Sequence, residues 1–276
     1  MKTDYILEKG SGRINEDCIV MDNTMFGVFD GATSLVKTVF DNHETGGFIA
    51  STTASQIFAK NGDSLISLAR DANNAILNGM LHHGVDCSRR ECLWSTSAAV
   101  IRLNGSFLEW VQSGDCAIIL VYGDNTSQVL GETRDHDYET LSMWREMALS
   151  TSLTIREALE DQILKIRAGM NQTYGVLNGE QAAESFLHSG IESLDGVTDI
   201  LIFTDGLALP NPKPEQHKCF DSLVELYRQL GLEGLKQHIR DIELSDPQCR
   251  RYPRFKCHDD IAAIAIQPNK PNTLSN

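Results

Sequence analysis

Two apolar runs in this chain end in the same dipeptide, an aspartate followed by a glycine. Met25–Phe29 leads into Asp30-Gly31, and Ile200–Thr204 leads into Asp205-Gly206. Each run has the length and composition of a buried strand, so each is expected to place a carboxylate where a strand leaves the core. A carboxylate there is costly to desolvate unless something compensates its charge. The glycine that follows allows the backbone to approach an ion closely.

Two more aspartates flank apolar segments. Asp17 precedes Cys18–Val20, and Asp259 lies just before Ile261–Ile264. Converging carboxylates repel one another without cations, and hard oxygen ligands of this type suit Mg²⁺ or Mn²⁺ rather than zinc. Asp-Gly after a strand is also an ordinary turn signal. The spacing by itself therefore leaves two readings open, a metal site and a set of turns.

The order of the elements predicts the fold class. Apolar and alternating patterns predict strands at 19–22, 25–30, 94–103, 106–113, 117–122, 198–204 and 261–266. Helical spacing predicts helices at 46–59, 63–83, 215–231 and 232–242. Runs of strands with separate groups of helices indicate an α+β fold, an antiparallel β-sandwich flanked by helices on both outer faces.

The segment from about 136 to 196 has a different character. Helical patterns at 138–150 and 154–168 precede a stretch rich in glycine and asparagine at 169–179. We expect this segment to be a flap insertion rather than core, with Asp135-His136-Asp137 as a polar turn at its entrance. The chain is otherwise expected to be a single domain, 1–268, with a polar tail at 269–276 that frays.

Composition excludes several classes of function. Lys and Arg total 24 against 38 Asp and Glu, so the formal charge is −14. A field of that sign repels phosphate backbones and disfavours nucleic-acid binding. No apolar run is long enough to span a membrane and no signal pattern opens the chain, so we expect a cytoplasmic monomer. Seven irregularly spaced cysteines favour free thiols over disulfides or a zinc cluster.

Six short motifs follow one another along residues 13 to 264. They are Arg13-Ile14-Asn15-Glu16-Asp17, Gly27-Val28-Phe29-Asp30-Gly31, Trp94-Ser95-Thr96-Ser97-Ala98, Ser113-Gly114-Asp115, Phe203-Thr204-Asp205-Gly206-Leu207 and Asp259-Asp260-Ile261. In this order they resemble the metal-dependent type-2C serine/threonine protein phosphatase family, in its bacterial form. Each motif is weak alone, whereas six in order cover nearly the whole chain.

The resemblance implies a two-metal phosphatase that uses Mn²⁺ or Mg²⁺. Asp30 would bridge two ions, and the carbonyl of Gly31 would bind one of them. Asp205 and Asp259 would bind the second ion. A water between the ions would lose a proton easily and attack phosphorus in line. The expected substrate is a phosphorylated protein, which loses phosphate from serine or threonine.

The resemblance also implies supporting roles for other residues. Asp17 and Glu16 would act mainly through metal-bound waters. Asp115, together with Asp205, would form a weaker third-metal site. Arg13 would bind phosphate, although it is one residue nearer the Asn-Glu-Asp motif than in the family.

Two further departures bear on the chemistry. Ala32 follows Gly31 where many members carry a histidine that is proposed as the general acid, and Asp260 replaces the usual asparagine. Leaving-group protonation must then come from metal-bound water or from another group. Two alternatives stay open, a weak or inactive signalling module of the same fold and a phosphatase of small metabolites.

Overall fold

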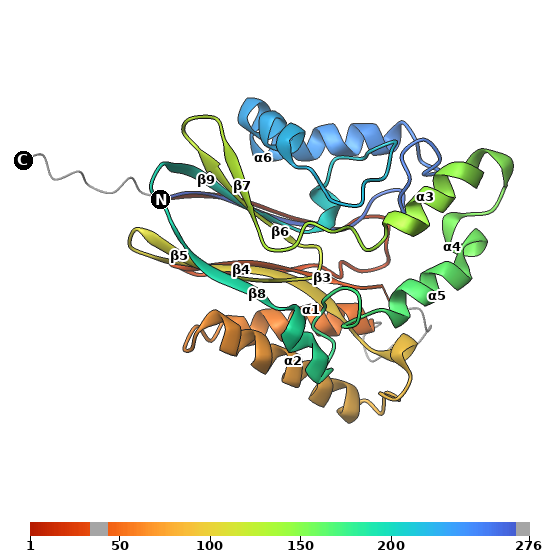
Figure 1. Ribbon diagram of the computed structural model, residues 1–276, viewed down its shortest axis with the longest axis horizontal. Helices are drawn as coiled ribbons and strands as arrows, with labels where there is room; N and C mark the ends of the chain where they lie inside the picture. The colour runs from red at the N-terminus through yellow and green to blue at the C-terminus, as the bar shows by residue number, and fades with distance from the viewer. Residues whose placement is uncertain (34–43, 269–276) are drawn as a thin grey trace, which may run out of the picture.

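Two antiparallel sheets of five strands each lie face to face in the computed structural model, which describes residues 1–33 and 44–268 (Figure 1). The first sheet has the order β1 (Lys2–Glu8), β10 (Ile261–Gln267), β9 (Val197–Phe203), β6 (Ala117–Tyr122) and β7 (Ser127–Leu130). The second has the order β2 (Cys18–Met21), β3 (Met25–Gly31), β4 (Thr96–Asn104), β5 (Phe107–Ser113) and β8 (His188–Ser193). The predicted α+β sandwich is therefore confirmed. The predicted tail at 269–276 lies outside the described residues.

The strand β3 shows why its sequence is apolar without alternation. Phe26 and Val28 point into the core between the two sheets. Met25 and Phe29 point the other way, into a second core beneath helices. Successive side chains of a strand face opposite sides, so a strand that is covered on both faces reads as a continuous apolar run.

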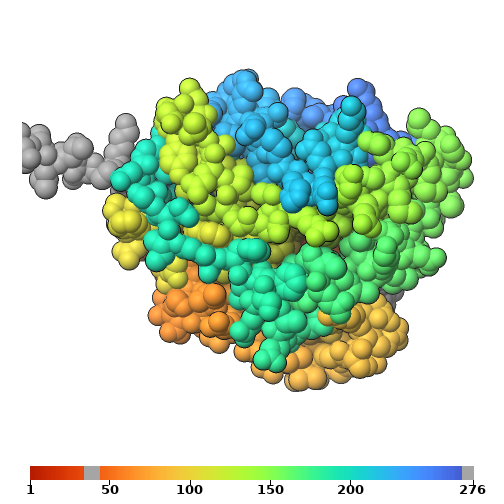
Figure 2. Space-filling model, viewed as in Figure 1, coloured from red at the N-terminus to blue at the C-terminus, as the bar shows by residue number. Residues whose placement is uncertain are grey.

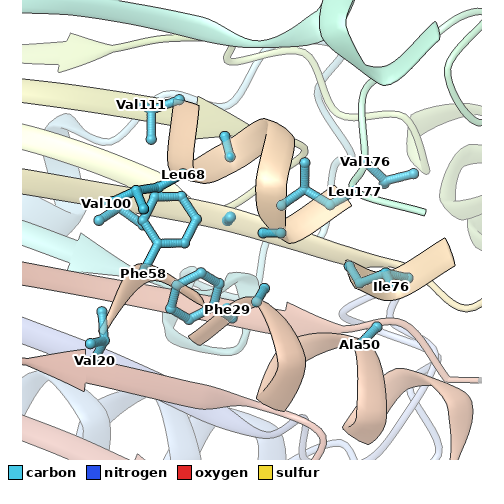
Figure 3. Close-up of a cluster of buried hydrophobic side chains, with 14 of the residues drawn as sticks. Val20, Phe29, Ala50, Phe58, Leu68, Ile76, Val100, Val111, Val176 and Leu177 are labelled. Carbon is cyan, nitrogen blue, oxygen red and sulfur yellow. The ribbon is translucent and has the colours of Figure 1, made fainter. Parts of the chain in front are cut away.

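Helices cover the outer faces of both sheets, as predicted. The helices α1 (Gly46–Phe58) and α2 (Leu65–His82) lie on the second sheet, and α6 (Asp221–Leu244) lies on the first (Figure 1). Figure 3 shows Phe29 of β3 packed against Phe58 of α1, with ring centroids 5.5 Å apart. The two helices expected at 215–231 and 232–242 form one element that begins later and breaks at Gly231, whose φ is 70°.

The helices α3 (Tyr138–Met147), α4 (Ile155–Ala158) and α5 (Glu160–Ala168) stand beyond one end of the sandwich (Figure 1). In the space-filling view they form the green end of the molecule (Figure 2). Short 3-10 helices complete the described elements, at Arg90–Cys92, Ala148–Ser150, Gln181–Phe186 and Asp205–Leu207. No helix in the described ranges is long and apolar enough to cross a membrane.

The expectation that all of 136–196 stands outside the core needs a correction. The strand β8 pairs with β5 along the edge of the second sheet, and Val176 and Leu177 lie in the core beneath α2. The sequence His188–Ser193 has alternating exposure and few apolar residues, which is typical of an edge strand. Its weak apolar pattern is the reason that the sequence did not predict it, and the same holds for β1, which lies at an edge of the first sheet.

The strands β5 and β6 follow one another closely in the sequence but do not pair. They lie in different sheets, and the turn at Ser113-Gly114-Asp115 carries the chain from one sheet to the other. Gly114 has a φ of 80°, which favours glycine. This crossing brings Asp115 to the end of the sandwich that also carries the other acidic residues.

Candidate metal centre

Strand ends from both sheets meet at one end of the sandwich. Antiparallel register places Asp30, at the end of β3, opposite Ser97 at the start of β4. The last residue of β9, Phe203, pairs with Ala263 of β10 and with Ala117 of β6, so Asp205 follows at the same end. A cleft of about 140 Å³ opens there. Its walls include five of the residues singled out in the sequence, namely Asp30, Gly31, Asp115, Asp205 and Asp259.

Asp17 lies just beneath this cleft, with 4% of its surface exposed. The hydroxyl of Thr204 donates a hydrogen bond of 2.7 Å to Oδ2 of Asp17. The same hydroxyl oxygen accepts a bond of 3.0 Å from the backbone N–H of Ala262. Thr204 therefore ties the ends of β9 and β10 to the residue that precedes β2.

The carboxylates of the cleft lie close enough to change one another's ionisation. Burial, followed by the charges of neighbouring aspartates, raises the pKa of Asp17 and of Asp30 well above the ordinary value. Burial and the charges of Asp115 and Asp259 raise the pKa of Asp205 to about 7. Buried carboxylates that repel one another ionise readily only when cations join them. An all-oxygen set of this kind fits Mg²⁺ or Mn²⁺.

Two glycines are required by the packing around these aspartates. A Cβ on Gly31 would collide with the backbone carbonyl oxygens of Gly47 and Glu16. A Cβ on Gly206 would collide with the carbonyl oxygen of Asp260. The Asp-Gly pairs at 30–31 and 205–206 therefore reflect close backbone approach at the cleft.

Glu16 and Asp260 are engaged in holding the loops rather than facing the cleft. The carboxylate of Asp260 accepts the backbone N–H groups of Gly10 at 2.7 Å and of Glu16 at 2.9 Å. The carboxylate of Glu16 accepts the hydroxyls of Thr33 at 2.7 Å and of Thr45 at 2.5 Å. Both side chains are buried. The extra charge of Asp260 is thus used to fasten the segment that carries Asp17.

Asp259 has a cationic partner that the sequence did not indicate. The ammonium of Lys256 donates a hydrogen bond of 2.6 Å to Oδ1 of Asp259. Across residues 1–33 and 44–268, no three acidic, histidine or cysteine side chains lie close enough to enclose an ion. In the described conformation these carboxylates therefore do not converge on one point.

Arg13 is not brought to the cleft. Its side chain is exposed, and it lines neither of the two cavities at this end of the molecule. Arg156 of α4 and Arg167 of α5 line the cleft instead. The guanidinium of Arg167 donates a bond of 3.2 Å to the carbonyl of Thr33. Helical periodicity alone does not distinguish these two arginines from other surface cations.

The protein phosphatase 2C family model matches residues 11–242, and the chain belongs to that family. This membership makes it a metal-dependent protein serine/threonine phosphatase, a hydrolase. No curated protein sequence matches the chain.

Solved structures with the same fold include bacterial phosphatases. The Mycobacterium tuberculosis serine/threonine phosphatase PstP/Ppp is 14% identical with a TM-score of 0.58, and the match covers 98% of this chain and 99% of that one. Stp1 from Staphylococcus aureus is 15% identical with a TM-score of 0.57, over 98% and 95%. The catalytic domain of PstP in complex with two manganese ions is 15% identical with a TM-score of 0.55, over 96% of each chain.

Proposed function

We propose that this chain removes phosphate from phosphoserine and phosphothreonine in proteins, with two Mn²⁺ or Mg²⁺ ions held at the cleft. The observation that carries the proposal is the set of buried and half-buried carboxylates that lie together at the strand ends, where the charges of neighbouring aspartates raise the pKa of Asp17, Asp30 and Asp205. Asp30, the carbonyl of Gly31, Asp205 and Asp259 would hold the ions, with Asp17 close by. The structurally similar catalytic domain of PstP was solved in complex with two manganese ions, which supports a site for two ions in this chain.

Bound ions would supply an easily deprotonated water and neutralise the negative charge of the phosphate. The chain's own residues hold the aspartates of the cleft in position. Thr204 orients Asp17 through its bond of 2.7 Å, and the guanidinium of Arg240 holds the backbone carbonyl of Asp259 at 2.8 Å. The family resemblance assigns contact with both ions to Asp30, which lies at the end of a strand that is buried on both faces.

Phosphate recognition is assigned to cations other than Arg13. Arg156 and Arg167 lie on the helices that stand beyond the sandwich, and Lys256 lines the same cleft. These side chains offer positive charge at the cleft of a protein whose formal charge is −14. An anionic substrate is attracted locally by such groups and by the ions, against the overall field.

The proposal places the enzyme in the cytoplasm, as a monomer that acts on phosphoproteins in signalling and does not bind nucleic acid. All seven cysteines are free, which supports a reducing compartment. The strong negative charge supports a partner other than nucleic acid.

The test is Mn²⁺-dependent hydrolysis of p-nitrophenyl phosphate and of a phosphothreonine peptide, alongside sugar phosphates and nucleotides. Asp30→Asn and Asp205→Asn should each abolish turnover. Asp71→Asn, on the exposed face of α2, is the matched control and should retain full activity. Metal binding without hydrolysis of any substrate would support the inactive signalling module. Faster hydrolysis of sugar phosphates or nucleotides than of the peptide would support a metabolite phosphatase.

A further inference from the structure

A cavity of about 460 Å³ adjoins the metal cleft, whose own volume is about 140 Å³. The two spaces have six lining residues in common, namely Asp115, Asp137, Asp205, Phe255, Lys256 and Asp259. The larger cavity is therefore continuous with the proposed catalytic site. The chemistry of the ions gives it no role, so its own walls must indicate what it binds.

The walls of this cavity are largely apolar. Leu209, Phe220 and Leu223 line it and pack into the hydrophobic core between the first sheet and α6. Leu141 of α3 and Phe255 of the loop before β10 line it as well, and they pack on a smaller core formed by α3 and α4. Packing against two cores holds these side chains in place around the cavity.

Prolines are concentrated in the same walls. The chain has seven prolines, and four of them line the cavity, namely Pro210, Pro212, Pro214 and Pro253. The first three are separated by single residues in the segment that leads to α6. Because the proline ring fixes φ, this wall keeps its shape without a bound partner. A preorganised surface loses little conformational entropy on binding, which favours affinity.

The charged groups of the cavity disfavour one class of side chain. Four of its carboxylates are assigned to no metal ion, those of Asp135, Asp137, Glu215 and Glu243. Its three cations are Lys218, Arg254 and Lys256, and the last two are already held by carboxylates at 3.1 and 2.6 Å. The wall therefore carries an excess of negative charge, which repels an acidic side chain.

We propose that this cavity binds an apolar residue of the phosphoprotein substrate, close in sequence to the phosphorylated serine or threonine, and that it disfavours an acidic residue there. The inference rests on the proposed function and adds the sequence preferred around the phosphate. Because the cavity is continuous with the cleft, its occupant belongs to the same molecule as the phosphate. Burial of an apolar side chain against these walls stabilises the complex in proportion to the area removed from water.

The experiment measures kcat/KM with Mn²⁺ for a set of phosphothreonine peptides. In each peptide one position, from three residues before the phosphothreonine to three after it, carries leucine, serine or glutamate. For the native protein, kcat/KM should be roughly tenfold higher with leucine than with serine at one or two positions, equivalent to about 1.4 kcal/mol. Glutamate at the same positions should lower kcat/KM below the value for serine.

Two variants change the cavity in different ways. Leu209→Asn makes a wall polar at nearly constant volume and should bring the ratio of kcat/KM for the leucine and serine peptides close to one. Ser222→Trp, in the exposed first turn of α6, places a bulky ring at the cavity and should have the same effect. Comparing two peptides on one variant cancels a general loss of activity. Glu225→Gln, on the exposed face of α6, is the control and should keep the native ratio.

Circular dichroism confirms the fold of each variant. Equal kcat/KM for leucine and serine at every position in the native protein would overturn the inference. A preference for leucine that persists in both folded variants would overturn it too, as would faster hydrolysis with glutamate than with serine. Absence of Mn²⁺-dependent hydrolysis of p-nitrophenyl phosphate, which has no neighbouring residue, would instead overturn the proposed function. The two failures are therefore distinguishable.

Discussion

Lys256 and Asp259 form an ion pair at the edge of the metal cleft, with Nζ 2.6 Å from Oδ1. The two residues are three positions apart on the loop before β10. The lysine lies against a carboxylate that the proposed function assigns to an ion, so its positive charge repels a cation that binds the same carboxylate. The burial cost of Lys256 is outweighed by the charge of Asp259, which raises the pKa of the ammonium and keeps it charged.

Replacing this lysine should tighten metal binding. Lys256→Met removes the competing cation and leaves a more negative site, so the affinity for Mn²⁺ should rise roughly tenfold, or about 1.4 kcal/mol. Titration calorimetry measures the change. Lys256→Arg keeps the charge and should bind Mn²⁺ with nearly native affinity. An unchanged or weaker affinity in Lys256→Met would show that the lysine does not compete.

The hydroxyl of Thr204 should contribute to stability through both of its bonds. Thr204→Val keeps the shape of the side chain but leaves Asp17 and the N–H of Ala262 without their partner. Because unsatisfied buried polar groups are costly, the free energy of unfolding should fall by about 1–3 kcal/mol. Urea unfolding of the metal-free protein gives the value. Thr204→Ser retains the hydroxyl, so its free energy of unfolding should fall much less. Equal falls in the two variants would argue against a stabilising role for the hydroxyl.

Arg240 links α6 to the loop that carries Asp259. Replacing it should therefore lower the free energy of unfolding far more than replacing an exposed cation. Its guanidinium bonds to Glu8 at 2.9 Å, to Glu243 at 2.8 Å and to the carbonyl of Asp259 at 2.8 Å. Arg240→Met removes the guanidinium from Glu243, which is 4% exposed, and also from Glu8 and from the carbonyl of Asp259. The expected loss in the free energy of unfolding is about 3–5 kcal/mol.

The matched control for Arg240 is Lys2→Met, whose pair with Asp4 is exposed. Exposed ion pairs contribute little, so this change should leave the unfolding curve nearly unaltered. Thermal melts of both variants report the difference. Similar melting temperatures for the two would contradict the importance of the buried pair.

Asp205 should make the metal-free protein less stable as pH rises. Its pKa is about 7 in the folded protein against 3.8 for the free side chain, so the folded state binds the extra proton. Stability falls with pH wherever the folded state holds more protons, which here is the range between those two values. Unfolding curves across that range should show a shallower fall for Asp205→Asn than for the native chain. Parallel curves would contradict the shifted pKa.

The sequence predicted most of the metal centre because its main ligands sit in local patterns. Asp30 and Asp205 each follow a buried strand and precede a glycine, and a strand–Asp–Gly pattern is visible within seven residues. Asp259 is likewise placed by the strand that follows it. The edge strands β1 and β8 escaped prediction because one or both of their faces are exposed, which weakens the apolar pattern.

The sequence by itself determined that this is a helix-flanked sandwich with carboxylates at the strand ends, because burial on two faces and close backbone approach leave local signatures. Only the tertiary structure decided which cations stand beside those carboxylates. Arg240 reaches Glu8 across 232 positions of the chain, and backbone pairing with Thr133 places Lys218 in the wall of a cavity that Asp115 also lines. Arg13, beside the first motif, stays exposed. Which charged groups interact depends on their distance in space, and the residues next to each group in the sequence do not reveal that distance.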